Sequence, residues 1–587
     1  MSLGQLSEQF KLAFSYYQNS QYDLAEFIFS KILESKPDHF DSLLLKGIIN
    51  VKKNTFIALE LVTKATNVNP NNPSGHYNLA LILEEMKLFD KALESYERTV
   101  RLRPDFPDAW LNRGNVLHVL MNLNDAVRSY DIAIRIKPDF AEAYYNRGVV
   151  LKELNRFEEA KDSYDIAIGL RPDFAEAYYN RGVVLKELNR FEEAKDSYDT
   201  AIRLRPDFAD AYYNRGAVLK ELNRFEEAKD SYDTAIRLRP DFADAYCNRA
   251  IVLEELNRFQ EAIENYDIAI RIKPDFANAK FNKSINLLLN GNLKKGFGLY
   301  EYRWETRDPV TKRKFDQPLW LGKENIEGKT ILIHSEQGLG DSIQFSRYLE
   351  LMRKYGAKVL FEVPKPLYGL FKNFNAPYEV LQKDDQLPYF DYHCPLLSLP
   401  LVFKTELLNI PSVTPYFFSD PEQNKYWEFQ LGKRIKPRIG IVWSGEAKHK
   451  KDHVRSMKLE ELASKLPVNF EYISLQKEVR EHDVASLKKY SIKHFGDQLH
   501  DFTDTASLIE CMDLVISVDT SVAHLSASLG KETWILISFM PDFRWFLGRD
   551  DSPWYKSVSL YRQKNDRQWA PVLERLSANL LNTSFHK

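Results

Sequence analysis

The sequence predicts an α-solenoid of helical repeats, followed by an α/β region with two parallel-sheet lobes. The first observation behind this prediction is a period of 34 residues in the first half of the chain. The second is a change near residue 329, after which short β-branched runs alternate with helix-like stretches, as in parallel sheets. Because this alternation occurs in two sets, we expect a repeat domain at 6–307, a linker at 308–328, and lobes at 329–430 and 436–587.

The repeats have the signature of tetratricopeptide units. A period of 34 with an aromatic residue, Gly, Ala and Pro at fixed offsets is typical of this repeat, and we count nine units. Small residues such as Gly148, Ala160 and Ala167 recur where neighbouring helices must approach. Each unit has too little core alone, so we expect stacking into a superhelix. The prolines that mark the period are Pro70, Pro104, Pro138, Pro172, Pro206, Pro240 and Pro274.

One polar position recurs along the array. The sixth residue of the first helix is Asn in seven consecutive units, on the side expected to be concave, where amides could grip an extended peptide backbone. This resembles the asparagine ladder of the protein O-GlcNAc transferases, although Asn is also common at this offset for packing. The Arg that follows it is equally regular, and the sequence leaves open whether it pairs with carboxylates or faces a ligand. The ladder is Asn78, Asn112, Asn146, Asn180, Asn214, Asn248 and Asn282.

Composition narrows the classes of function. The 81 Lys and Arg nearly balance the 83 Asp and Glu, which gives no support to a nucleic-acid partner. The three cysteines, Cys247, Cys394 and Cys511, lie far apart, so neither a disulfide framework nor a zinc site is expected. No signal peptide and no apolar run of about 18 residues is visible, so we expect a cytoplasmic chain without a membrane span.

The α/β region contains one strand–turn–helix with a chemical signature, LVISVDTSVAHLSASLGK at 514–531. A buried strand is followed by Asp519, Thr520 and Ser521 and then by a helix that starts near Val522. Free N–H groups at a helix start, at the carboxyl end of a parallel strand, predict an anion site. The alternative is an ordinary helix cap. Strands are expected at 330–334, 358–363, 378–381, 438–445, 470–476, 514–518 and 533–538.

The motifs of the second half resemble those of the family 9 glycosyltransferases, which include the ADP-heptose heptosyltransferases. The matching stretches run in order over about 300–575 and include GLGD at 338–341, IGIVWSG at 439–445, ISLQK at 473–477 and FRWFLGRDDSPWY at 543–555, together with the 518–531 motif. The resemblance implies a GT-B fold, in which two Rossmann-like lobes bind the acceptor and the nucleotide sugar. One departure is Ser346-Arg347, where family members often have proline.

The resemblance also implies roles for residues. Asp341 matches the catalytic base, in a turn with Gly338 and Gly340 on the acceptor side, with helix capping as the alternative role for Asp341. Lys448, or its neighbour Lys450, could neutralise the departing nucleoside diphosphate. We see no D-x-D motif and expect no metal and no cofactor beyond the donor substrate. The residues expected around the nucleotide sugar are Asp519, Thr520, Ser521, Val522, Ala523 and His524.

The leading interpretation is a glycosyltransferase that moves a sugar from a nucleoside diphosphate sugar to an acceptor, expected to be a protein held by the repeats. Two alternatives stay open. One is an interaction scaffold whose transferase-like domain is inactive. The other is a heptosyltransferase-like enzyme of surface polysaccharide synthesis.

Overall fold

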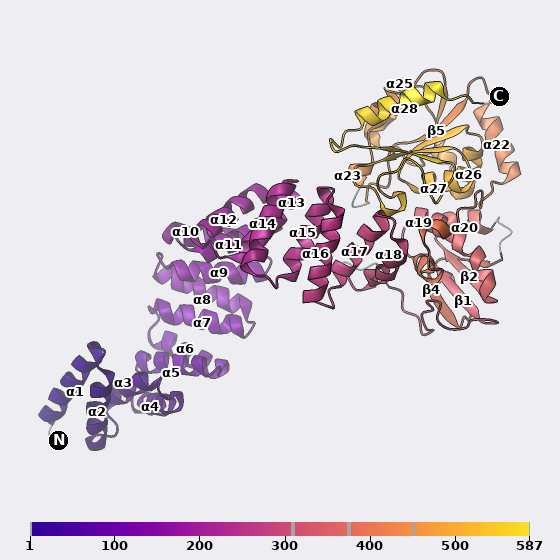
Figure 1. The fold of residues 1–587 in the computed structure, drawn as a ribbon. Helices are drawn as coiled ribbons and strands as arrows, with labels where there is room; N and C mark the ends of the chain where they lie inside the picture. The colour runs from indigo at the N-terminus through magenta and orange to yellow at the C-terminus, as the bar shows by residue number, and fades with distance from the viewer. Residues whose placement is uncertain (1–2, 307–311, 373–376, 449–451, 586–587) are drawn as a thin grey trace. The chain divides into compact units, whose positions relative to one another are not determined.

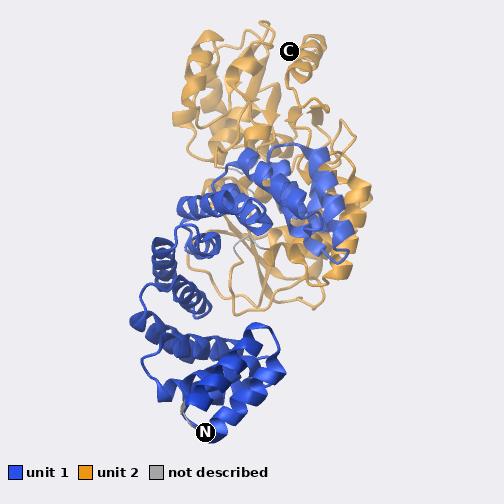
Figure 2. Cartoon of the chain, turned by 90° about the vertical axis from the view of Figure 1, so that its left-hand side faces the viewer, with its two compact units in different colours: residues 1–252 blue, residues 253–587 orange. Residues whose placement is uncertain are grey.

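The computed structural model describes residues 3–306, 312–372, 377–448 and 452–585 (Figure 1). The chain forms two compact units, residues 1–252 and 253–587 (Figure 2). The first contains helical repeats only. The second begins with the last repeats and continues into two parallel sheets.

The repeats are successive helix pairs of a solenoid, as the 34-residue period predicts. Within the described residues they are α1 (Leu3–Gln18), α2 (Tyr22–Ser35), α3 (Phe40–Asn50), α4 (Thr55–Val68), α5 (Pro73–Glu85), α6 (Phe89–Leu102), α7 (Pro107–Val119), α8 (Leu123–Ile136), α9 (Ala141–Glu153), α10 (Phe157–Leu170), α11 (Ala175–Glu187), α12 (Phe191–Leu204), α13 (Ala209–Glu221), α14 (Phe225–Leu238), α15 (Ala243–Glu255), α16 (Phe259–Ile272), α17 (Ala277–Leu289) and α18 (Leu293–Tyr300).

Local chemistry explains the turn within each pair. In the central repeats an Asn follows the first helix and adopts a left-handed conformation, as at Asn155 and Asn189, both with φ 57°. Asn tolerates this conformation better than most residues, so it ends the helix cleanly. The first helix then lies close enough to the second that Gly148 touches the ring of Tyr164.

The recurring arginine of the first helix forms hydrogen bonds to the helices before and after it. Arg181 in α11 bonds to Asp165 in the preceding helix at 2.5 Å and to Ser197 in the following helix at 2.7 Å. Arg147 and Arg215 do the same one repeat earlier and later. The question that the sequence left open is therefore answered in favour of carboxylate pairing, which ties three successive helices together.

The second unit has two sheets in which every strand pair is parallel. The four-stranded sheet has the order β3-β2-β1-β4 and the six-stranded sheet has the order β10-β9-β8-β5-β6-β7. The strands are β1 (Thr330–His334), β2 (Lys358–Val363), β3 (Glu379–Gln382), β4 (Tyr392–Pro395), β5 (Arg438–Val442), β6 (Glu471–Ser474), β7 (Lys493–His494), β8 (Leu514–Val518), β9 (Thr533–Ile537) and β10 (Val558–Arg562).

Helices connect these strands. They are α19 (Leu339–Phe345), α20 (Lys365–Lys372), α21 (Leu399–Val402), α22 (Pro421–Leu431), α23 (Asp452–Arg455), α24 (Leu459–Ala463), α25 (Val484–Lys489), α26 (Phe502–Glu510), α27 (Ser521–Ser528) and α28 (Ala570–Asn582). Short 3-10 helices are η1 (Glu301–Trp304), η2 (Ser346–Tyr348), η3 (Glu350–Tyr355), η4 (Leu396–Ser398), η5 (Leu407–Asn409), η6 (Glu481–Asp483), η7 (Gly496–Gln498) and η8 (Phe543–Trp545).

Three strands were not expected from the sequence: β4, β7 and β10. β4 begins with Tyr392-His393 and ends with Pro395, so it lacks the β-branched run that marks the other strands. The stretch expected to be a linker also contributes to this sheet, because Leu319 pairs with His393 and Trp320 is fully buried. Residues 308–311 of that stretch lie outside the described residues.

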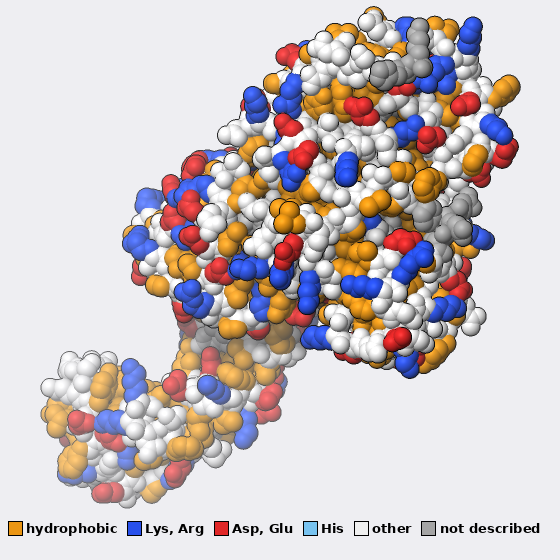
Figure 3. All heavy atoms as spheres, turned by 45° about the vertical axis from the view of Figure 1, so that its right-hand side comes forward, with side chains coloured by type: hydrophobic (Ala, Val, Ile, Leu, Met, Phe, Trp, Pro, Cys, Tyr) orange, Lys and Arg blue, Asp and Glu red, His pale blue; other side chains and the backbone are white. Residues whose placement is uncertain are grey.

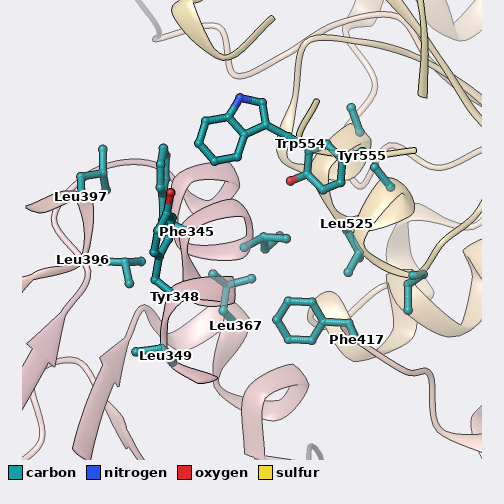
Figure 4. Packing of buried hydrophobic residues seen from close by; sticks show 14 of the residues in the cluster. Phe345, Tyr348, Leu349, Leu367, Leu396, Leu397, Phe417, Leu525, Trp554 and Tyr555 are labelled. Atoms are coloured by element: carbon teal, nitrogen blue, oxygen red, sulfur yellow. The ribbon is translucent and has the colours of Figure 1, made fainter. Parts of the chain in front are cut away.

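One hydrophobic core joins the two sheets and the last repeat. Phe345 meets the Trp554 ring edge-on at 5.7 Å, and Leu525 and Phe417 line the same core (Figure 4). Phe297 of α18 packs against Phe345 as well. Outside the core, charges of both signs are interspersed on the face shown in Figure 3.

The packing of Gly148 gives a matched pair of substitutions. A Cβ at Gly148 would lie 2.7 Å from the Tyr164 ring, whereas a Cβ at Gly169 of α10 has nothing within 4 Å. Gly148→Ala should therefore destabilise the solenoid by roughly 1–3 kcal/mol through overpacking. Gly169→Ala should stabilise it by up to about 1 kcal/mol through helix propensity. Urea unfolding checks this, and equal effects of both substitutions would contradict the packing.

Candidate functional site

Each sheet has a point where its strand order reverses, and both points carry a polar turn. In the six-stranded sheet the chain runs outward from β5 to β7 and returns to β8 on the other side of β5. In the four-stranded sheet β1 lies between β2 and β4. Ligands of open α/β sheets bind outside the carboxyl ends of strands at such a reversal. The turns after β1, β5 and β8 are therefore the candidate site.

The turn after β8 opens α27. Thr520 is the residue before the helix, in extended conformation, and its side chain makes no capping bond to the first helical turn. Its hydroxyl lies 3.1 Å from that of Ser517 instead. The N–H groups of Ser521, Val522 and Ala523 have no partner within a helix at these positions, so they remain suited to an anion.

Two arginines flank the turn after β5. Arg455 donates to the backbone oxygen of Asp519 at 3.0 Å and so links this turn to the one after β8. A Cβ at Gly445 would meet the Arg455 guanidinium, so a side chain at this position would displace that guanidinium. Arg480 donates to the Gly445 oxygen at 3.2 Å and to Asp452 at 2.6 Å. The result is a pair of fixed cations beside the reversal point.

The glycine turn after β1 packs against α27. The Gly338 N–H donates to Asp341 at 2.9 Å, which holds the turn in shape. A Cβ at Gly340 would lie 2.9 Å from the His524 ring and 3.4 Å from the Ser521 Cα. α19 and α27 therefore pack in direct contact (Figure 1). The two motifs that the sequence singled out, one on each sheet, are brought together.

Asp341, which the resemblance matches to a catalytic base, is ion-paired in the structure. Its carboxylate bonds to Arg544 of η8, and the two side chains are only 14% and 8% exposed. Arg544 also bonds to Asp542 at 2.5 Å. Burial raises the pKa of Asp341 above the usual carboxyl value, and the Arg544 charge opposes that rise. The Asp341 carboxylate is thus engaged by the Arg544 guanidinium and by the Gly338 N–H.

His524 lies in an aromatic cage. Its ring stacks on Trp545 at 5.0 Å, and Nδ1 is 3.1 Å from the Tyr555 hydroxyl. Burial, together with the positive charge of Arg544, lowers the pKa of His524 to about 3. Burial, with the nearby Asp542, raises the pKa of Asp519 to about 6. A neutral imidazole at this place can orient a ligand by hydrogen bonding, and it cannot serve as a cation near pH 7.

Lys448 lies on the exposed loop after β5, and its neighbour Lys450 lies outside the described residues. Arg455, Arg480 and Arg544 contact these turns, and Arg303 bonds to Glu336 in the turn after β1. Sequence reasoning assigned none of Arg455, Arg480 and Arg544 an individual role, although Arg544 falls within the quoted stretch 543–555. In residues 3–306, 312–372, 377–448 and 452–585, no group of three or more His, Cys, Asp or Glu is placed to hold a metal ion. Nor is any helix in those ranges long and apolar enough to cross a membrane.

The asparagine ladder is partly engaged inside the solenoid. The amide nitrogens of Asn112, Asn180, Asn214 and Asn248 each donate to a tyrosine hydroxyl of the preceding repeat, at 2.9–3.1 Å. Asn146 donates instead to Asn115 at 2.9 Å. One N–H donor of each of these amides is therefore used for packing, and the carbonyl oxygen is left for a ligand at Asn112, Asn214 and Asn248, whereas that of Asn180 accepts from Lys152.

The asparagines at the two ends of the ladder, Asn78 and Asn282, have different surroundings. Asn78 donates to Ser74 of its own helix. The repeat before Asn282 has Cys247, and the repeat before Asn146 has Leu111, at the offset where Tyr77, Tyr145, Tyr179 and Tyr213 lie in the others. Asn180 is also bonded by Lys152, so it is the rung most deeply engaged.

Comparisons with known proteins address the repeats. Family models described as "TPR repeat" and "Tetratricopeptide repeat" match residues 73–106, 122–155, 141–174, 184–223, 209–242 and 243–276. These segments are tetratricopeptide repeats. Repeats of this kind present extended binding surfaces, which suggests protein–protein interaction.

Individual relatives share about half of the chain or less. Protein FlbA of Caulobacter vibrioides is 26% identical over 326 residues, which is 50% of this chain, and the chain spans about half (53%) of FlbA. YrrB, described as a TPR protein with an unusual peptide-binding site, is 25% identical over 32% of this chain and 98% of its own, with a TM-score of 0.31. PilF of Pseudomonas aeruginosa is 18% identical over 34% and 92%, also at 0.31.

The environment of His524 predicts a pH dependence of stability. A histidine whose pKa falls from about 6.5 unfolded to about 3 folded stabilises the chain above pH 6.5. That contribution is lost as the pH falls from 6.5 towards 3. At pH 5 the loss is about 2 kcal/mol, because each pKa unit is worth about 1.4 kcal/mol.

His524→Gln should therefore narrow the stability gap between pH 7.5 and pH 5, measured by urea unfolding. His500→Gln, at an exposed position, accounts for the general effect of losing a histidine. An unchanged gap in the His524 variant would show that this imidazole is not buried in the neutral form.

Proposed function

We propose that the chain is a glycosyltransferase of GT-B-like architecture, which transfers a sugar from a nucleoside diphosphate sugar to a protein acceptor held by the repeats. The observation that carries the proposal is the meeting of two reversal-point turns, Gly338–Asp341 and Asp519–Ser521, in one place. A reaction between two substrates needs both bound against each other, and a contact between two sheets provides that. The family 9 resemblance supports the same assignment.

The donor side is the six-stranded sheet. Its diphosphate would lie against the start of α27, with Arg455 and Arg480 as fixed positive charges at the turn after β5. Such cations stabilise the charge that develops on a departing nucleoside diphosphate, so a divalent metal is not required for this role.

The acceptor side is the four-stranded sheet with Asp341. The acceptor hydroxyl oxygen forms the new bond to the anomeric carbon, and its proton passes to the Asp341 carboxylate. The bond between that carbon and the phosphate oxygen breaks, and its electron pair leaves with the diphosphate. A buried carboxylate with a raised pKa is a better proton acceptor than an exposed one.

The repeats supply the acceptor in this proposal. Amide oxygens of the asparagine ladder can accept from peptide N–H groups, since the amide nitrogens already bond to tyrosines. A second candidate function is an interaction scaffold without catalysis. The observation that favours it is the Asp341–Arg544 pair, which occupies the proposed base.

Donor turnover separates these two functions. The full chain is incubated with ADP-, GDP-, UDP-, CDP- and dTDP-sugars, and nucleoside diphosphate release is measured. We expect release from at least one donor, insensitive to EDTA. Asp341→Asn should lower turnover about 10²–10⁴-fold, as loss of a general base does.

Arg455→Gln should weaken donor binding at least tenfold, because a charge-assisted hydrogen bond contributes about 1.5–3 kcal/mol. Lys488→Gln removes an exposed cation of α25, which connects β6 and β7, and should leave binding unchanged. No release from any donor by the parent chain would reject the enzyme and leave the scaffold.

A further inference from the structure

Arg544 is a buried cation with an unused hydrogen-bond donor. Its side chain is 8% exposed, and its two terminal nitrogens bond to Asp341 and Asp542. Its Nε has no hydrogen-bond partner among the described residues. A guanidinium presents donors in a planar fork that matches the oxygens of phosphate groups as well as those of carboxylates.

Arg544 also lies beside the proposed donor site. Its partner Asp341 adjoins Gly340, where a Cβ would lie 3.4 Å from the Ser521 Cα at the start of α27. The Arg544 charge acts on both Asp519 and His524 and alters their pKa values. A diphosphate bound at the start of α27 would therefore lie within the influence of Arg544, in competition with the Asp341 carboxylate.

Other polar groups in this region are also unsatisfied. Both amide atoms of Gln344 in α19 and the indole N–H of Trp554 are buried without a partner among the described residues. Trp554 packs on Phe345, the residue after Gln344. Buried polar groups are normally paired, so these unpaired atoms could make hydrogen bonds to a polar ligand. A sugar with its hydroxyl groups has the required chemistry.

We infer that Arg544 is a latch: it holds Asp341 in the ligand-free chain and exchanges that carboxylate for the diphosphate of the donor, which frees Asp341 to accept the proton. This inference rests on the proposed function. It makes the base available only when a donor is bound. Two anions that compete for one cation are coupled, so removing one must raise the affinity for the other.

The test is calorimetric titration of the full-length protein with inorganic pyrophosphate and with the five nucleoside diphosphates. Asp341→Asn removes the competing charge and keeps an oxygen that can accept from the Gly338 N–H. It should bind pyrophosphate at least tenfold more tightly than the parent. Arg544→Gln should lose pyrophosphate binding, and Arg544→Lys, which keeps the charge without the fork, should bind with intermediate affinity.

Asp551→Asn is the matched control, since Asp551 pairs with Arg549 in the same segment but is 70% exposed. Its pyrophosphate affinity should equal that of the parent. Near-ultraviolet circular dichroism identifies any variant that fails to fold. Equal pyrophosphate affinity in the parent and the Asp341 variant would overturn the latch and leave the donor site standing.

Two other outcomes are also decisive. Parent-like affinity in the folded Arg544→Gln variant would remove Arg544 from the site. Failure of both the parent and the Asp341 variant to bind pyrophosphate or any nucleoside diphosphate would overturn the proposed donor site and the latch together.

Discussion

The packing of α19 against α27 is the contact on which the arrangement of the second unit depends. It requires glycine at position 340, because any side chain there would collide with His524. Once the helices touch, the carboxyl ends of β1 and β8 face a common place, and Asp341 reaches Arg544. The hydrophobic core that contains Phe345 of α19 and Trp554 stabilises the contact between the two helices. The position of the two turns and the Asp341–Arg544 ion pair thus depend on the close approach of α19 to α27.

The solenoid is stabilised differently, because similar side-chain hydrogen bonds recur between the helices of successive repeats. Arginine–carboxylate bonds such as Arg181 to Asp165 and amide–tyrosine bonds such as Asn214 to Tyr179 repeat every 34 residues. Each bond spans neighbouring helices, so stability is distributed along the array. The polar residues that first suggest a ligand groove therefore serve packing as well, and only part of each amide is left for a partner.

The sequence was sufficient for elements whose pattern is local. The helix pairs follow from periodicity, and β1, β2, β5, β8 and β9 follow from apolar runs. The strands β4 and β10 and the roles of Arg455 and Arg544 depend on neighbours distant along the chain, so no local pattern marks them. Arg544 lies 203 residues from Asp341. The turns at Gly338 and Asp519 could be nominated from the sequence, but their contact could not.

The central claim is that these two turns form one ligand site. Hydrogen–deuterium exchange of the full-length protein, with and without a saturating nucleoside diphosphate sugar, tests it most directly. The account predicts that amides of 338–345 and of 520–528 become protected together, while amides of the central repeats at 141–170 do not change. Protection of only one of the two segments, or of the repeats alone, would contradict it.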